Sequence, residues 1–88
     1  QAGPKATQTF EAVVTEATNF GLLVELPDFL ISGLIHVSSL KDDFFSFDPL
    51  RRQLRGRRTG QTYKAGSRLR VVVLRIDFPK RQVDFRPA

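Results

Sequence analysis

Four side chains in the sequence have the chemistry to bind a flat, anionic ligand such as nucleic acid. Phe20 and His36 carry planar rings on which bases can stack in a sequence-tolerant way, a contact worth about 1–3 kcal/mol per base. Arg81 can pair with a phosphate or stack on a base. Asp77, four residues earlier, can accept a hydrogen bond from a base or a ribose hydroxyl, or it can orient Arg81.

Each of these residues also has a structural interpretation, because a lone Phe is more often part of a core and a lone His usually has a structural role. Phe20 precedes Gly21, a glycine that can re-aim its aromatic neighbour at a bulge or close approach. His36 ends the segment Gly-Leu-Ile-His. We therefore interpret both rings as ligand contacts. The remaining phenylalanines are assigned to packing: Phe10, Phe29, Phe44, Phe45, Phe47, Phe78 and Phe85.

An arginine-rich segment adds a second candidate surface. Five guanidinium groups fall within eight residues, a density that suits a patch tracking a phosphate backbone with strong salt dependence. The alternatives are a solvated segment, or one that packs on an acidic surface of a longer protein. The five residues are Arg51, Arg52, Arg55, Arg57 and Arg58.

Composition limits the other functions. There is no Cys and only one His, which excludes a disulfide framework, a Cys-based zinc site and a His cluster. Asp42, Asp43 and Asp48 lack the spacing of an EF-hand, and Asp77 and Asp84 have no accompanying nucleophile or His that would make them a catalytic pair. We therefore expect no catalytic residue, metal site or cofactor in these 88 residues.

The net charge is +5, with ten Arg and four Lys, and a basic surface attracts polyanions. A basic surface without a partner is the alternative interpretation. No segment is apolar for long enough to span a membrane, and no signal peptide opens the chain. We expect no membrane association and a cytoplasmic location, and the initial Gln suggests a fragment of a longer chain.

Short alternating segments predict strands at residues 9–16, 22–26, 33–37, 68–77 and 81–85. Five such strands without a convincing long helix indicate an all-β, five-stranded closed barrel of the OB type. Residues 41–66 form a long insert between the third and fourth strands. Leu50 and Leu54, at i and i+4, predict that the insert is partly helical, and its three Phe are expected to hold it against the barrel. Residues 1–8 are expected to be a flexible lead, and residues 9–86 the folded domain.

Three separated motifs resemble the S1 RNA-binding domain family: Phe20-Gly-Leu-Leu-Val24, Gly33-Leu-Ile-His-Val-Ser38, and Leu69-Arg-Val-Val-Val73 followed by Asp77 and Arg81. The insert is similar to that of the C-terminal S1 domain of ribonuclease R and ribonuclease II type exoribonucleases. Two positions depart from the family pattern. Leu23 stands where Phe is usual, and Val72 where Lys is frequent, which removes a stacking platform and a phosphate contact.

The resemblance implies an RNA-binding face made of Phe20, Leu23, His36, Asp77 and Arg81. It also implies a module that captures single-stranded RNA for a separate catalytic domain of a 3′-to-5′ exoribonuclease. Magnesium would belong to that catalytic domain, and the catalytic and cold-shock domains of the parent chain would be its neighbours. The alternatives are an S1 repeat of a translation or transcription factor, and an OB-type protein-interaction module whose arginine-rich loop docks on an acidic partner.

Overall fold

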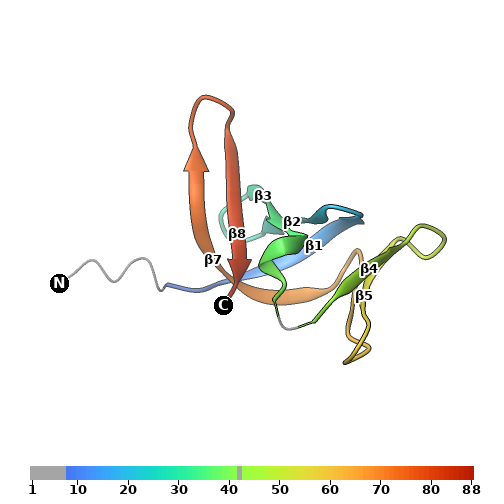
Figure 1. Ribbon diagram of the computed structural model, residues 1–88. Coiled ribbons are helices and arrows are strands. Elements are labelled where there is room, and N and C mark those ends of the chain that lie inside the picture. Colours follow the sequence, from blue (N-terminus) through green and yellow to red (C-terminus); the bar gives the residue numbers. More distant parts are fainter. Residues whose placement is uncertain (1–7, 42) are drawn as a thin grey trace.

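The computed structural model describes residues 8–41 and 43–88, which form an all-β structure with one helical turn (Figure 1). Five strands close into a barrel in the order β1-β2-β3-β8-β7, and three form a second sheet in the order β4-β5-β6. The predicted five-stranded barrel is confirmed. In chain order the elements are β1 (Phe10–Thr18), β2 (Gly21–Leu26), β3 (Ile31–His36), the 3-10 helix η2 (Val37–Ser39), β4 (Phe45–Asp48), β5 (Gln53–Gly56), β6 (Thr62–Tyr63), β7 (Arg68–Asp77) and β8 (Gln82–Pro87).

The barrel interior is filled by alternate residues of its strands, as the period of two requires. Leu22 and Val24 of β2 are buried, and they meet Ile35 of β3, Val71 of β7 and Phe85 of β8 in one hydrophobic core. Burying a side chain of this size stabilises a fold by about 1.5–3 kcal/mol. The strands β3 and β8 run parallel, whereas the other neighbours in the barrel are antiparallel. Because β3 pairs directly with β8, segments far apart in the sequence lie next to each other in the barrel.

The insert between β3 and β7 is a small antiparallel sheet, so the prediction that it is partly helical was wrong: none of its described residues is helical. Asp48 Oδ1 accepts hydrogen bonds from the backbone N–H groups of Leu50 and Arg51, at 3.0 and 3.2 Å. This turn reverses the chain between β4 and β5. Leu50 consequently lies 94% exposed at the turn, while Leu54 on β5 is buried in the core.

Asp43 fixes the second turn of the insert. Its carboxylate accepts hydrogen bonds from the backbone N–H groups of Thr59 (2.7 Å), Arg58 (3.0 Å) and Phe44 (2.7 Å), and from the Thr59 hydroxyl (2.8 Å). These bonds, led by that from the Thr59 backbone, hold the pKa of the Asp43 carboxyl well below its usual range. Asp43 is thus a structural residue of the turn that carries Arg57 and Arg58.

The assignment of every other Phe to packing was partly wrong. Phe45 and Phe47 pack on the core and hold the insert against the barrel, as expected. Phe44 and Phe78, however, are 80% and 78% exposed. Phe29 packs edge-on against Phe10, with ring centroids 5.4 Å apart, yet more than half of it is exposed. Turns end the alternation of a strand, so sequence pattern does not decide the burial of residues within them.

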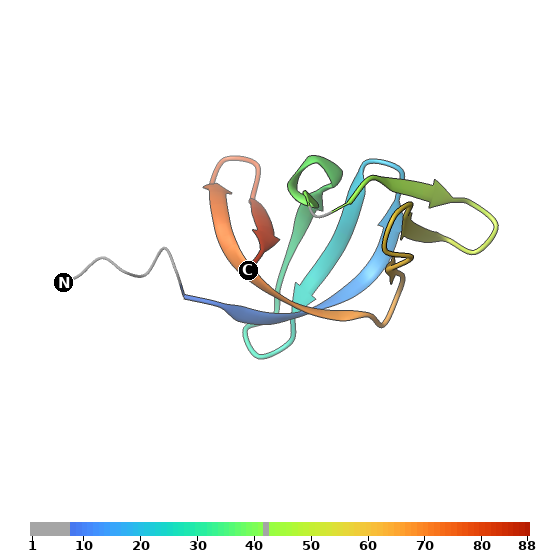
Figure 2. The ribbon, with the colours of Figure 1, turned by 60° about the horizontal axis from the view of Figure 1, so that its bottom comes forward.

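The two hairpins project from opposite ends of the molecule, whose extents are 43 × 24 × 22 Å. Figures 1 and 2 both show the β7–β8 hairpin rising at one end and the β4–β5 hairpin extending at the other. The sheet face between them is carried by β2, β3 and β8. This arrangement sets the positions of the candidate binding residues.

Candidate nucleic-acid interface

Phe20 and His36 lie side by side on the outside of the barrel. Phe20 occupies the turn between β1 and β2, where the Thr18 hydroxyl accepts hydrogen bonds from the backbone N–H groups of Phe20 and Gly21, at 3.3 and 3.2 Å. The Phe20 carbonyl accepts a hydrogen bond from the Val37 N–H at 2.9 Å, and Gly21 pairs with His36 across β2 and β3. Both rings are exposed. The structure therefore brings together two planar side chains that are sixteen positions apart in the sequence.

Gly21 is what permits this close approach. Its φ is +154°, and a Cβ at this position would collide with the Ile35 carbonyl oxygen. The neighbouring strand is therefore packed against the Gly21 backbone itself. The sequence interpretation of Gly21 as a close-approach glycine agrees with this geometry.

Leu23 and Arg81 share a hollow on the same side of the barrel. The hollow has a volume of about 360 Å³ and is also lined by Leu34 of β3 and by Lys80 and Gln82. Arg81 adopts a positive φ of 53° in the turn between β7 and β8, and its N–H donates to the Phe78 carbonyl at 3.1 Å. The exposed side chain of Leu23 thus lines the same hollow as the cationic side chains of Lys80 and Arg81.

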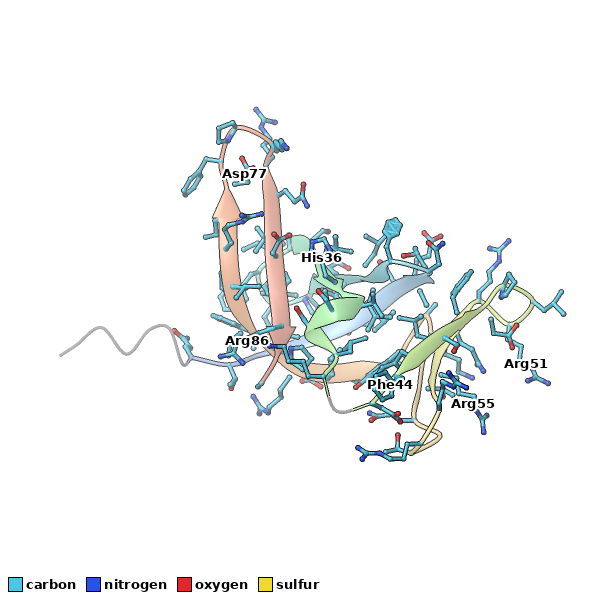
Figure 3. All side chains as sticks on the ribbon, in the orientation of Figure 1. His36, Phe44, Arg51, Arg55, Asp77 and Arg86 are labelled. Atoms are coloured by element: carbon cyan, nitrogen blue, oxygen red, sulfur yellow. The ribbon has the colours of Figure 1, made fainter. Side chains whose placement is uncertain are left out.

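Asp77 lies at the end of β7, at the projecting end of the hairpin in Figure 3. Its Oδ1 accepts a hydrogen bond from the Lys80 N–H at 3.2 Å, and Asp77 pairs with Gln82 across the hairpin. Among the described residues, no ion pair within 4.0 Å joins Asp77 to Arg81. Asp77 therefore contacts the turn that carries Arg81 through the Lys80 N–H.

Sequence reasoning missed the centre of the face, which is Asp84. Its carboxylate is almost buried, and Oδ1 lies 3.9 Å from Nε2 of His36 and accepts a hydrogen bond from Gln82 Nε2 at 3.4 Å. Arg75 Nη2 donates to Oδ2 at 3.4 Å. His36, Asp84 and Arg75 come from three neighbouring strands, β3, β8 and β7. The carboxylate bonds a guanidinium group and lies close to a ring, and both of these groups reach solvent.

The family of the chain follows from comparison with known proteins. The family model described as the S1 RNA binding domain matches residues 4–86. The chain belongs to the S1 RNA-binding domain family. It is called the S1 domain below.

Several of the similar relatives are named ribonuclease R. The S1 domain is 42% identical to ribonuclease R of Escherichia coli over 76 residues, which are 86% of this chain and 9% of the relative. It is also 42% identical to ribonuclease R of Thermotoga maritima over 78 residues, 89% of this chain and 11% of the relative. The chain thus spans about a tenth of the curated relatives it matches, and it is homologous to the S1 domain of ribonuclease R.

Solved structures of a ribonuclease R also match this domain. The S1 domain matches ribonuclease R of Mycoplasma genitalium with a TM-score of 0.84 and 31% identity, over 92% of this chain and 13% of that chain. The same protein has been solved in complex with ribose-methylated single-stranded RNA, and that structure matches equally well.

The arginine-rich segment lies on the insert. Figure 3 places Arg51 and Arg55 on the insert, at the end of the S1 domain opposite Asp77. All five arginines of this segment are exposed, and Arg51 Nη1 lies 3.8 Å from Asp48 Oδ2. The second predicted surface of RNA contact is thus carried by the insert, and the Asp77 end of the first lies far from it.

Two further classes of site were searched in the described part of the S1 domain. Residues 8–41 and 43–88 contain no group of three or more His, Cys, Asp or Glu side chains that could hold a metal ion. No helix in these ranges is long and apolar enough to cross a membrane.

Proposed function

We propose that this S1 domain binds single-stranded RNA on the face formed by Phe20, Leu23, His36 and Arg81, and that it delivers RNA to a separate catalytic domain of a 3′-to-5′ exoribonuclease. The observation that carries the proposal is the pairing of two exposed rings beside a cationic hollow. The complex of the Mycoplasma genitalium relative with single-stranded RNA supports it.

The geometry suits binding without strong sequence preference. Bases stack on Phe20 and His36 through their flat faces, which every base possesses. Lys80 and Arg81 contact phosphates, so affinity falls as salt rises. Leu23 offers an apolar contact but no aromatic face, and it therefore contributes less than a ring would at the same place.

The proposal also covers the longer protein to which this domain would belong. We infer a cytoplasmic ribonuclease R type enzyme whose catalytic domain uses magnesium and whose cold-shock domains neighbour this one. The S1 domain itself performs no catalysis in this scheme. The homology to ribonuclease R favours this over an S1 repeat of a translation or transcription factor.

Fluorescence anisotropy with a labelled oligo(U) tests the proposal. Replacing Phe20 by Ala removes a stacking platform worth about 1–3 kcal/mol, which corresponds to an affinity loss of roughly 5-fold to 150-fold. His36→Ala should act in the same direction. Phe44→Ala is the control, since it removes a ring that is even more exposed than Phe20 but lies outside the proposed face, and it should leave affinity unchanged.

Two outcomes contradict the proposal. If Phe20→Ala and Phe44→Ala bind RNA equally well, the rings of the face do not stack on bases and contact is electrostatic. If the wild type binds an acidic protein in a salt-sensitive manner that RNA does not compete, the domain is a protein-interaction module.

A further inference from the structure

A second hollow lies where the barrel meets the insert. It has a volume of about 380 Å³, and we call it the insert hollow. Four parts of the chain meet around it: the end of η2 with the residues that follow it, the insert around β4 and β6, Leu74 of β7, and the end of β8. The lining side chains that matter for its chemistry are Ser39, Lys41, Gln61, Tyr63, Leu74 and Arg86.

Two cations face this hollow. Lys41 and Arg86 are exposed, and in the described part of the chain neither forms an ion pair. The hydrogen bond of Arg86 runs from Nη1 to the Pro87 carbonyl at 3.2 Å, which leaves the other guanidinium donors available. A phosphate between Lys41 and Arg86 would satisfy both charges.

The remaining walls suit a planar group. Tyr63 lies with its ring centroid 5.6 Å from that of Phe45, and its hydroxyl accepts a hydrogen bond from Gln61 Nε2 at 3.0 Å. Leu74 of β7 adds an apolar surface to the lining of the hollow. Cations next to aromatic and apolar walls match the two parts of a nucleotide, its phosphate and its base.

The insert hollow continues the proposed RNA face. Gln82, Asp84 and Arg86 alternate along β8 and therefore point to the same outer side. Gln82 lines the hollow of Leu23, Asp84 contacts His36, and Arg86 lines the insert hollow. Adjacent positions in this row are about 7 Å apart, because a strand rises about 3.3 Å per residue. An RNA strand that follows β8 past His36 thus arrives at Arg86; Figure 3 shows Arg86 and His36 on the same part of the barrel.

We propose that the insert hollow is an additional nucleotide subsite for the same single-stranded RNA. Lys41 and Arg86 hold a phosphodiester group, and the adjoining base lies against Tyr63 and Leu74. This inference rests on the proposed function, since it needs RNA on the barrel face. It gives the insert a role in RNA binding that is distinct from that of its arginine-rich segment.

The chain contains its own probe of this subsite, because Tyr63 is its one Tyr and it has no Trp. Tyrosine emission therefore reports on the hollow alone. We would titrate the domain with unlabelled oligo(U) of about twelve nucleotides, within the range that one OB fold accommodates, and would follow tyrosine emission and competition against a labelled oligonucleotide together. Ala88 lines the hollow, so a second preparation extended by Gly-Ser moves the terminal carboxylate away.

The test variant is Lys41→Ala with Arg86→Ala, and the control is Lys64→Ala with Arg68→Ala. Both remove two exposed cations, and the control residues do not line the hollow. Wild type and control should show quenched tyrosine emission on RNA binding. The test variant should lose the quenching, bind about tenfold more weakly and show a salt slope lower by about 1 per lost phosphate contact.

The outcomes separate this inference from the proposed function. If the wild type binds labelled RNA without quenching Tyr63, and both double variants bind alike, the subsite is absent while the RNA face stands. If the wild type binds no RNA at low salt, the proposed function fails and the subsite fails with it. Equal thermal unfolding midpoints of the two double variants show that folding does not cause any difference between them.

Discussion

The Asp84 carboxylate lies 3.9 Å from the His36 imidazole, on the neighbouring parallel strand of the barrel. Its other oxygen accepts a hydrogen bond from Arg75, so one nearly buried carboxylate lies beside two groups that reach solvent. An acidic group next to His36 in the proposed RNA-binding face opposes the phosphate charge. Its position is explained if it serves to orient His36 and Arg75.

Asp84→Asn should therefore weaken RNA binding by about fivefold, the equivalent of about 1 kcal/mol, although the variant is more positive by one charge. The free energy of unfolding should fall by about 1–2 kcal/mol, because a charge-assisted hydrogen bond is lost. Anisotropy and urea denaturation measure the two effects. Tighter RNA binding by Asp84→Asn would mean that the carboxylate acts only as an unfavourable charge.

The barrel could be predicted from the sequence because much of each strand alternates between buried and exposed residues, although β1 and β7 contain irregularities in register. Leu22 and Val24 face inward while Leu23 faces outward, and the same period places Ile35 inside and His36 outside. The five barrel strands occur where this alternation predicts them, with ends shifted by one or two residues.

The insert and the centre of the face could not be predicted in this way. Leu50 and Leu54 have helical spacing, but the hydrogen bonds of Asp48 in the intervening turn favour a hairpin. Asp84 reaches His36 only because β3 and β8 pair in parallel. That pairing joins segments almost fifty residues apart, and no local pattern encodes it.

We expect the free energy of unfolding to depend on pH because of the lowered pKa of Asp43. Its folded pKa is depressed, so the carboxylate contributes stability that is fully present above the unfolded pKa of about 3.9 and is lost as the pH falls through the folded value. Urea denaturation of the wild type should show a falling free energy of unfolding below about pH 4. Asp43→Asn should lose this part of the pH dependence and be less stable at neutral pH. Parallel curves for the two proteins would show that the hydrogen bonds to Thr59 and Arg58 do not stabilise the fold.

Gly21→Ala should destabilise the domain and weaken RNA binding together. The added Cβ meets the backbone of Ile35, which cannot rotate away as a side chain can, and overpacking of this kind costs about 1–3 kcal/mol. The shift of β2 against β3 also separates Phe20 from His36. Gly66→Ala is the control, since Gly66 has a φ of +95° but no atom within 4 Å of the added Cβ. Thermal unfolding and anisotropy should show a larger loss at Gly21 in both measurements.

Leu23→Phe should raise the affinity of the domain for single-stranded RNA. Leu23 is partly exposed on β2, opposite Leu34 of β3, and it lines the hollow that contains Arg81. A ring at this position adds a third stacking platform next to a cation, and one additional base contact of about 1 kcal/mol or slightly more should tighten binding about fivefold to tenfold. The gain should persist at high salt, because stacking does not depend on counterion release. Leu50→Phe adds a ring at an exposed turn of the insert and controls for general hydrophobicity. Two outcomes would contradict this prediction: an equal rise in RNA affinity for both variants, or no rise for Leu23→Phe. In either case RNA does not pass over β2 at Leu23, and the proposed face must be confined to Phe20 and His36.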